Sequence, residues 1–381
     1  MKYRIFLTLI AFNICLLGIG LNSFNMTNIT QFLKSQVDNH ETPSVHYAFF
    51  DTESTIYELK YGSKRVKTNE PVSDSTMYHL FSVTKTFTAL AVLQLVQSGK
   101  VALDRPVSEY LPSFTYPHDI TVAQLLSHTA GIPNPLPLRW IHLEEEHRYF
   151  ERDHFFAGIF QEHPKLVFKP GTEFKYSNLG YVVLGQLIEQ VSGQTYEDYV
   201  RTNILRRAGI DSSEISFRLD TSLHATGYQK RWSIGNLLLD VLIDKRKFMG
   251  VHEGRWKPFR PFYNNGIAYG ALFRSARGLI KYAQALMKSD SVLLDERHKQ
   301  ILFTETVVGG NGTGMSMSWF TGSLKGNRFV SHAGGGGGYY VELRVYPELG
   351  VGSVILYNRS GMRDERILDK TDAYFITEAV K

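Results

Sequence analysis

The chain of 381 residues contains a single cysteine, Cys15, and it lies in the apolar amino-terminal stretch. A disulfide needs two thiols and a thiolate metal site needs several, so the sequence excludes both, and it excludes a cysteine nucleophile after that stretch. The net charge is also small: the chain has 42 Lys and Arg and 37 Asp and Glu, which gives +5. A nucleic-acid-binding domain would show clustered basic residues, so we expect no nucleic-acid partner.

Long hydrophobic runs are scarce, and the one that stands out covers residues 5–21, without a charged residue and behind Lys2 and Arg4. A short basic start followed by an apolar stretch is typical of a secretory signal or an uncleaved anchor. We therefore predict that residues 1–24 are a signal peptide or membrane anchor. Residues 25–381 would then work outside the cytoplasmic membrane, either released to the periplasm or exterior, or held at the outer side of the membrane through residues 5–21.

The remaining composition is that of a globular protein, with 43% hydrophobic and 21% charged residues. Its length is roughly two to three times that of an average domain, which favours one large two-part fold or two domains. We treat residues 25–381 as one hydrolase domain, for the reasons given by the motifs below.

Strand patterns occur at both ends of the chain and helical patterns fill the middle. Alternating apolar residues predict a strand around Val45–Phe49, and residues 54–60 could be its hairpin partner. Further strands are predicted over residues 319–324, 328–333, 340–346 and 351–357, and helices over residues 84–97, 121–131, 184–191, 278–288 and 371–380. This order predicts an α/β (α+β) fold, with an antiparallel sheet built from both chain ends, flanking helices and an inserted, mostly helical lobe.

The run Ser82-Val83-Thr84-Lys85 lies at the start of the helix predicted over residues 84–97. Positions i and i+3 share one helix face, so Lys85 would lie one turn from Ser82. A serine hydroxyl becomes nucleophilic when a base takes its proton, and a buried lysine with a lowered pKa can be that base. The run predicts this pair as catalytic, although such short matches also arise by chance.

Tyr176 and Asn178 form a second candidate, following a Pro-Gly pair at residues 170–171. A tyrosine can exchange protons if positive neighbours depress its pKa, and Lys85 would supply that charge. The Asn178 amide offers a donor and an acceptor to a substrate. The alternative interpretation is a core tyrosine with an asparagine that caps a helix.

A third candidate is His332-Ala333-Gly334-Gly335, at the end of a predicted strand. Glycines at a strand edge allow a substrate to approach closely, and a free N–H there can complete an oxyanion hole. The alternative is a mobile loop, because residues 334–338 are consecutive glycines.

Taken together, these motifs resemble the serine beta-lactamase and penicillin-binding protein superfamily. The similarity is to its branch of class C-like enzymes, D-alanyl-D-alanine carboxypeptidases, D-amino-acid peptidases and esterases, and it covers residues 40–375. Its landmarks are F-S-V-T-K at 81–85, L-L-S-H-T-A-G at 125–131, P-G-T-E-F-K-Y-S-N-L-G-Y at 170–181 and H-A-G-G-G-G-G at 332–338. Each motif is weak alone, but their order and spacing agree.

The resemblance implies roles for the motif residues. Ser82 would be the acylated nucleophile, Lys85 and Tyr176 its proton-transfer partners, and Asn178 a substrate contact. The backbone N–H groups of Ser82 and Gly335 would form the oxyanion hole. His128, in the L-L-S-H-T-A-G motif, would have a structural role near the site.

One departure concerns the substrate. Where beta-lactamases carry K-T-G, this chain has His332-Ala333-Gly334, and there is no S-D-N, which argues against the class A branch. Histidine is mostly neutral at pH 7, so the contact that the lysine makes with a substrate carboxylate is weakened. We therefore expect short esters or D-amino-acid amides to react better than beta-lactams. We also expect that lowering the pH towards 6 reduces this difference in reactivity between the esters or amides and the beta-lactams, because it protonates His332.

Two other stretches carry weaker signals. Four histidines, at positions 142, 147, 154 and 163, fit no compact metal-ligand spacing, so we expect no metal and no cofactor, and interpret the stretch as a solvated lid. Residues 230–260 hold eight Lys or Arg against three Asp or Glu, around the apolar segment 237–243. Contact with anionic lipid or cell-wall polymer is one interpretation, but an insertion that covers the helical lobe is favoured.

The sequence thus predicts an exported serine hydrolase that cleaves an amide or ester bond of a small molecule or peptide, with cell-wall peptide as one candidate. The alternatives are a beta-lactamase, or a penicillin-binding or cell-wall sensor protein that acylates slowly and never turns over. A further alternative is acyl transfer to an amine or alcohol instead of water.

Overall fold

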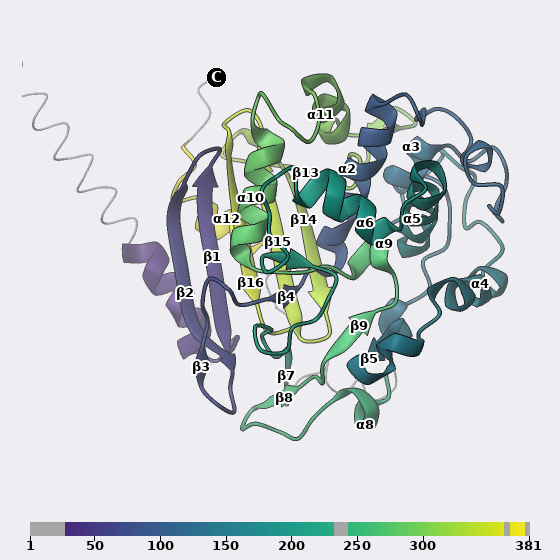
Figure 1. Ribbon diagram of the computed structural model, residues 1–381. Coiled ribbons are helices and arrows are strands. Elements are labelled where there is room, and N and C mark those ends of the chain that lie inside the picture. The colour runs from purple at the N-terminus through teal and green to yellow at the C-terminus, as the bar shows by residue number, and fades with distance from the viewer. Residues whose placement is uncertain (1–26, 232–242, 362–365, 378–381) are drawn as a thin grey trace, which may run out of the picture.

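The computed structural model describes residues 27–231, 243–361 and 366–377 (Figure 1). The predicted signal over residues 1–24 and most of the apolar segment 237–243 lie outside the described residues. Among the residues described, no helix has the length and apolar character needed to cross a membrane.

A seven-stranded antiparallel sheet forms the centre of the molecule, in the order β13-β14-β15-β16-β1-β2-β3 (Figure 1). Its strands are β1 (Ser44–Asp51), β2 (Thr55–Arg65), β3 (Glu70–Pro71), β13 (Phe320–Leu324), β14 (Asn327–Gly336), β15 (Tyr339–Tyr346) and β16 (Val351–Tyr357). Because β1 pairs with β16, strands from both ends of the chain share one sheet. The predicted architecture is confirmed, and β14 runs into the glycines, beyond the predicted end at residue 333.

Both faces of this sheet are covered, so its central strands are buried on both sides. On β1, Tyr47 and Phe49 face a cluster formed with the helical residues 27–38 and with α12 (Ile367–Asp372). Phe50 belongs to the larger cluster on the opposite face, where the helices of the central part of the chain pack. Alternation along the strand thus divides its side chains between two cores.

The inserted part of the chain is mostly helical. Its helices are α2 (Thr84–Gln97), α3 (Val122–Leu126), α4 (Arg152–Glu162), α5 (Asn178–Ser192), α6 (Tyr196–Val200), α8 (Lys245–Phe248), α9 (Ile267–Gly270), α10 (Ala276–Met287) and α11 (Glu296–Phe303). α2 spans the predicted residues, α3 begins with a capping box formed by Thr121 and Gln124, and α5 ends at Gly193 in a left-handed conformation. The prediction of a final helix at residues 371–380 is wrong in position, since α12 ends at Asp372.

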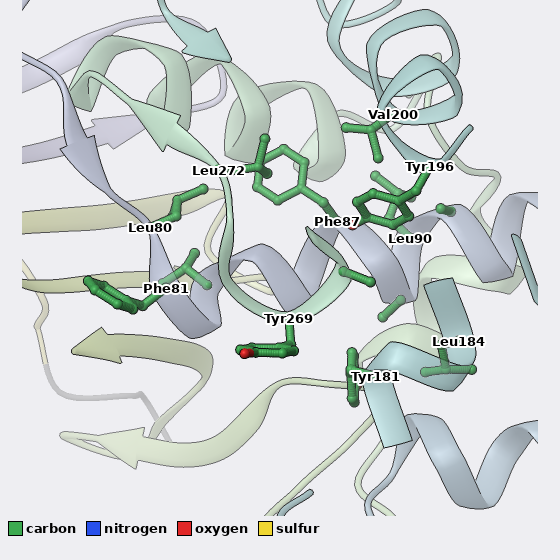
Figure 2. Packing of buried hydrophobic residues seen from close by; sticks show 14 of the residues in the cluster. Leu80, Phe81, Phe87, Leu90, Tyr181, Leu184, Tyr196, Val200, Tyr269 and Leu272 are labelled. Atoms are coloured by element: carbon green, nitrogen blue, oxygen red, sulfur yellow. The ribbon is translucent and has the colours of Figure 1, made fainter. Parts of the chain in front are cut away.

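Helix α2 lies at the centre of the lobe and is buried on every side from Thr84 to Leu95. Figure 2 shows Tyr181 and Tyr269 on one side of it, and Tyr196 and Val200 on another. A helix that is apolar all round belongs in a core, because it has no face for solvent. This packing holds the first turn of α2, and with it the S-x-x-K motif, in a rigid surrounding.

Short strand pairs connect the lobe to the sheet. They are β4 (Tyr78–His79) with β10 (Phe273–Arg274) and β6 (Ile215–Ser216), β5 (Ile141–Leu143) with β9 (Phe262–Asn264), β7 (Tyr228–Lys230) with β8 (Trp256–Pro258), and β11 (Val307–Val308) with β12 (Asn311–Gly312). β4 leads directly into the turn that carries Ser82, and the β5–β9 ribbon lies beside it.

Candidate active site

Ser82 lies in a single 3-10 turn, Phe81–Val83, between β4 and α2. Phe81 has a φ of 44°, a left-handed backbone conformation that bulky residues rarely adopt. Such strain persists only where the surrounding structure enforces it, and it is concentrated at functional sites. The turn therefore presents Ser82 in a conformation that the local sequence would not choose by itself.

Strand β14 approaches this turn more closely than any side chain would permit. A Cβ on Gly334 would lie 2.1 Å from the Leu80 carbonyl oxygen and 3.1 Å from the Ser82 nitrogen. In the described chain β14 pairs with β13 only as far as Ser331, so the edge that follows faces the Ser82 turn. The mobile-loop interpretation is wrong, because residues 334–336 belong to β14 and pair with β15.

The Lys85 amine lies directly beside the Ser82 hydroxyl. Lys85 Nζ donates to Ser82 Oγ at 3.0 Å and to the Tyr269 carbonyl oxygen at 3.1 Å. The side chain is fully buried, and the rings of Tyr176, Tyr181 and Tyr269 lie 4.9–5.6 Å from Nζ. Burial holds the pKa of Lys85 well below its usual value. A lowered pKa favours the neutral form of the amine, whose lone pair can take the Ser82 proton.

Tyr176 lies against the same amine, but its pKa is shifted opposite to the sequence-based expectation. Burial raises the pKa of the Tyr176 phenol above its usual value, and the neighbouring Ser82 hydroxyl offsets this only in part. Desolvation by burial, and not the expected lowering by Lys85, decides the direction of this shift. Tyr176 therefore rests as a phenol, equipped to donate a proton.

Asn178 is the first residue of α5 and offers an unused acceptor. Ser177 is the helix cap, since its Oγ accepts from the Gly180 backbone N–H at 3.1 Å, so the interpretation of Asn178 as the cap is wrong. The Asn178 backbone N–H is bound to Asn134 Oδ1. Its own Oδ1 is buried and has no hydrogen-bond partner among the described residues. This oxygen can accept a substrate N–H.

A cavity of about 100 Å³, partly open to solvent, lies directly against Ser82. Its lining consists of Phe81, Ser82, Pro137, Ile141, Asn178, Ile243, Phe259, Phe262, Asn264, Tyr269, Gly270, Gly335, Gly336 and Gly337. Of the residues predicted from sequence, Ser82, Asn178 and Gly335 line it, while Lys85 and Tyr176 lie beneath Ser82. Within the part of the chain that the structure describes, none of the lining side chains is charged.

The comparisons with known proteins agree with this geometry. The model of the Beta-lactamase family matches residues 29–375. The chain belongs to the beta-lactamase family. The family includes hydrolytic serine enzymes, and the S-x-x-K serine and lysine of this chain lie in contact in the fold, as described above.

Two relatives illustrate the sequence similarity within the beta-lactamase family. Penicillin-binding protein 4* of Bacillus subtilis (strain 168) is 25% identical over 292 residues, covering 74% of this chain and 61% of that protein. Protein flp of Staphylococcus aureus (strain NCTC 8325 / PS 47) is 27% identical over 307 residues, covering 78% of this chain and 56% of that protein. The chain thus spans only 56–61% of the length of these relatives.

Solved structures share the fold. The octameric penicillin-binding protein homologue from Pyrococcus abyssi has a TM-score of 0.73 at 25% identity, covering 91% of this chain and 76% of that one. The D-amino acid amidase from Ochrobactrum anthropi SV3 has a TM-score of 0.73 at 18% identity, covering 92% and 98%. A class C beta-lactamase has a TM-score of 0.70 at 19% identity, covering 93% and 97%.

His332, which stands where the motif resemblance places the lysine of K-T-G, is buried beside the site. Only 1% of it is exposed, its Nδ1 lies 2.8 Å from the Ala333 carbonyl oxygen, and its ring lies 6.2 Å from the ring of Tyr176. Burial, with Lys85 nearby, lowers the pKa of His332 to about 3. The expectation that pH 6 would protonate His332 is therefore wrong. Neither His332 nor Gly334 lines the cavity.

His128 packs beneath Tyr176 and fixes the segment that carries it. Its Nδ1 accepts from the Ser177 backbone N–H at 3.1 Å, and its ring centroid lies 4.3 Å from that of Tyr176. Burial holds the pKa of His128 well below its usual value, so the ring is neutral. This geometry agrees with the structural role that the family resemblance implied.

The four histidines differ in burial: His142 is buried, His163 is half-buried, and His147 and His154 are exposed, as the interpretation of a solvated stretch expects. His142 is buried, with Nδ1 2.8 Å from Asn265 Oδ1 and Nε2 2.9 Å from His147 Nδ1. Among the described residues, no three His, Cys, Asp or Glu side chains are placed to hold a metal ion. His142 belongs to the β5–β9 ribbon and the His147 ring stacks on Tyr263 of β9, while Ile141 of the same ribbon lines the cavity.

Sequence reasoning missed the residues that complete the site. The carbonyl oxygen of Tyr269 binds the Lys85 amine, and Phe262 and Asn264 line the cavity from β9. These residues are more than 170 positions from Ser82 in the chain, and no local motif marks them. The glycines on either side of Tyr269, Gly266 and Gly270, were the available sequence signal for a close approach at this point. A Cβ on Gly266 would lie 1.8 Å from the Tyr269 ring.

Proposed function

We propose that this protein is an exported serine hydrolase that cleaves an amide or ester bond through an acyl-enzyme on Ser82. The observation that carries the proposal is the neutral, buried Lys85 amine 3.0 Å from Ser82 Oγ at the wall of the cavity. A serine nucleophile is activated when a base contacts its hydroxyl and a further group holds that base in position. The Tyr269 carbonyl is that further group.

The acylation step follows from the resting protonation states. Lys85 takes the Ser82 proton while Oγ bonds to the substrate carbonyl carbon, and the backbone N–H groups of Ser82 and Gly335 stabilise the oxyanion. When the intermediate collapses, the bond to the leaving group breaks and the Tyr176 phenol gives that group its proton. Lys85 then returns a proton to Tyr176. The net transfer is one proton from Ser82 to the leaving group.

Deacylation uses the same groups in reverse. A water molecule attacks the acyl carbon and gives a proton to Tyr176 as Tyr176 passes its own proton to the Lys85 amine. The bond between the acyl carbon and Ser82 Oγ then breaks, and the protonated Lys85 returns a proton to Oγ. The peptidase, carboxypeptidase and esterase types share this chemistry. The D-amino acid amidase from Ochrobactrum anthropi and a D-alanine carboxypeptidase from Burkholderia cenocepacia, which share the fold, support the proposal.

The direct test is a panel of p-nitrophenyl esters, D-amino-acid peptides and nitrocefin, with the intact mass of the protein measured during turnover. We expect product release, and a transient mass increase that maps to the peptide containing Ser82. A stoichiometric adduct that persists without product would instead support the slowly acylating sensor protein. An unmodified protein that is inactive on the whole panel would contradict the proposal.

We expect the protein to favour neutral substrates over carboxylate-bearing beta-lactams at every pH between 6 and 8. The reason is that His332, with a pKa of about 3, stays neutral across this range. His332→Lys should raise kcat/KM for nitrocefin roughly 10- to 150-fold, the value of a charge-assisted hydrogen bond of about 1.5–3 kcal/mol. The control is His332→Asn, which keeps a short polar side chain without charge. Equal nitrocefin rates for both variants would contradict the prediction, as would an ester-to-nitrocefin ratio that falls at pH 6.

Export is the second part of the proposal, and it is supported by the basic start and apolar run of residues 1–24. Fusing residues 1–40 to a reporter that works only after export should give activity outside the cytoplasmic membrane. Replacing two leucines of the run, Leu16 and Leu17, by aspartate should abolish it, because charge in the apolar core prevents insertion. A reporter that stays in the cytoplasm with the unaltered segment would overturn this part.

A further inference from the structure

We infer that the cavity beside Ser82 selects acyl groups that carry an uncharged aromatic or branched apolar side group. This inference rests on the proposed function, because it concerns the acyl group that Ser82 would hold. An acyl group stays bonded to Ser82 Oγ after the leaving group has gone, so it must occupy space that Ser82 lines. Among the described residues, the cavity against Ser82 provides that space.

The walls of the cavity are aromatic and aliphatic. Phe81, Phe259, Phe262 and Tyr269 contribute rings, and Ile141 adds a branched side chain. A carboxylate or ammonium group placed among them would lose hydration without gaining a counter-charge, which is costly. The neighbouring amine of Lys85 provides no such counter-charge in the cavity, because Lys85 is buried behind Ser82 and does not line it. An apolar group instead gains from leaving water.

The wall at Phe262 is held in place before any substrate arrives. Its ring stacks on the buried His79 ring, with centroids 4.3 Å apart and an interplanar angle of 12°. On another side lies Gly337, where a Cβ would come within 2.3 Å of Phe262 Cζ. Gly337 has a φ of 47°, so the turn that follows β14 needs glycine for both reasons. A wall fixed in this way binds a matching group without an ordering cost.

Ile141 marks the place where the selectivity can be reversed. It pairs with Asn264 in the β5–β9 ribbon, and both line the cavity. The ribbon is anchored by the Asn265 backbone N–H, which donates to the Trp140 carbonyl oxygen at 2.9 Å. Ile141 is only half-buried, so a lysine there can keep its ammonium partly hydrated while it faces the cavity.

The experiment compares p-nitrophenyl acetate, 3-methylbutyrate, phenylacetate and monosuccinate, with each kcat/KM divided by the rate constant for hydroxide hydrolysis of the same ester. We expect the full-length protein to favour phenylacetate and 3-methylbutyrate over acetate at least tenfold, and to turn over monosuccinate most slowly. Phe262→Ala should lower the phenylacetate-to-acetate ratio at least tenfold, and Phe262→Leu should lower it less. Ile141→Lys should raise the corrected kcat/KM for monosuccinate relative to that for acetate at least tenfold.

Phe303→Ala is the matched control, because Phe303 is a buried ring that packs on Trp319 away from the cavity. We expect it to leave all ester ratios unchanged. Equal corrected values for the neutral esters, or an unchanged ratio in both Phe262 variants, would overturn the inference while the proposed function stands. If Phe262→Ala does not fold, Phe262→Leu and Ile141→Lys decide the question. If no ester leaves an acyl group on Ser82, the proposed function itself fails.

Discussion

Ser82→Ala is expected to abolish turnover of every ester and amide and to abolish covalent labelling by a fluorophosphonate or a labelled penicillin. The loss should be on the order of 10⁴-fold or more, because the alanine leaves only substrate binding and the oxyanion donors in place. Ser82 is partly exposed at the cavity wall, so removing its hydroxyl leaves the packing of Phe81 and Val83 intact. The thermal unfolding midpoint should therefore change little.

The matched control is Ser331→Ala, which removes a hydroxyl from β14 outside the cavity. It should retain both turnover and labelling. Adduct formation is read by intact mass and mapped to a peptide. Labelling of Ser82→Ala at the same stoichiometry as the unaltered protein would show that another residue is the nucleophile.

Lys85→Met and Tyr176→Phe are expected to lower kcat/KM by on the order of a hundredfold or more each, because each removes a proton-transfer group. Methionine fills most of the lysine's volume without an amine, which limits the loss of packing in the first turn of α2. The double variant should be little worse than the worse single variant, because the two groups pass the same proton. Additive losses in this cycle would show that one of the two residues only supports the fold.

The pH profile provides a second readout of the same pair. Since burial holds the pKa of Lys85 well below its usual value, kcat/KM should reach its plateau well below the pH at which an ordinary lysine loses its proton. It should fall only on the acid side, where the amine binds a proton. A rate that instead rises tenfold per pH unit from pH 7 to 9 would indicate a lysine with an ordinary pKa. Tyr176→Phe should keep the position of the acid limb while lowering the plateau.

Local sequence determined the secondary structure around the site and the pairing of Ser82 with Lys85. The i, i+3 spacing that places Lys85 beside Ser82 is a property of one helical turn, and α2 spans the predicted residues. The sheet built from both chain ends also follows from local patterns, because strand alternation and turn residues act over a few positions. The family resemblance rested on the same short motifs.

Tertiary structure alone decided the protonation states and the selectivity of the site. The pKa of Lys85 falls, that of Tyr176 rises and that of His332 drops to about 3 because elements distant in sequence remove water from all three. Desolvation is a sum over everything packed around a group, and a motif contains none of those neighbours. The same holds for the cavity, whose aromatic wall at Phe262 comes from a strand that no motif predicts. The motifs therefore named the candidate catalytic groups, while packing determined the direction in which the pKa of each is shifted.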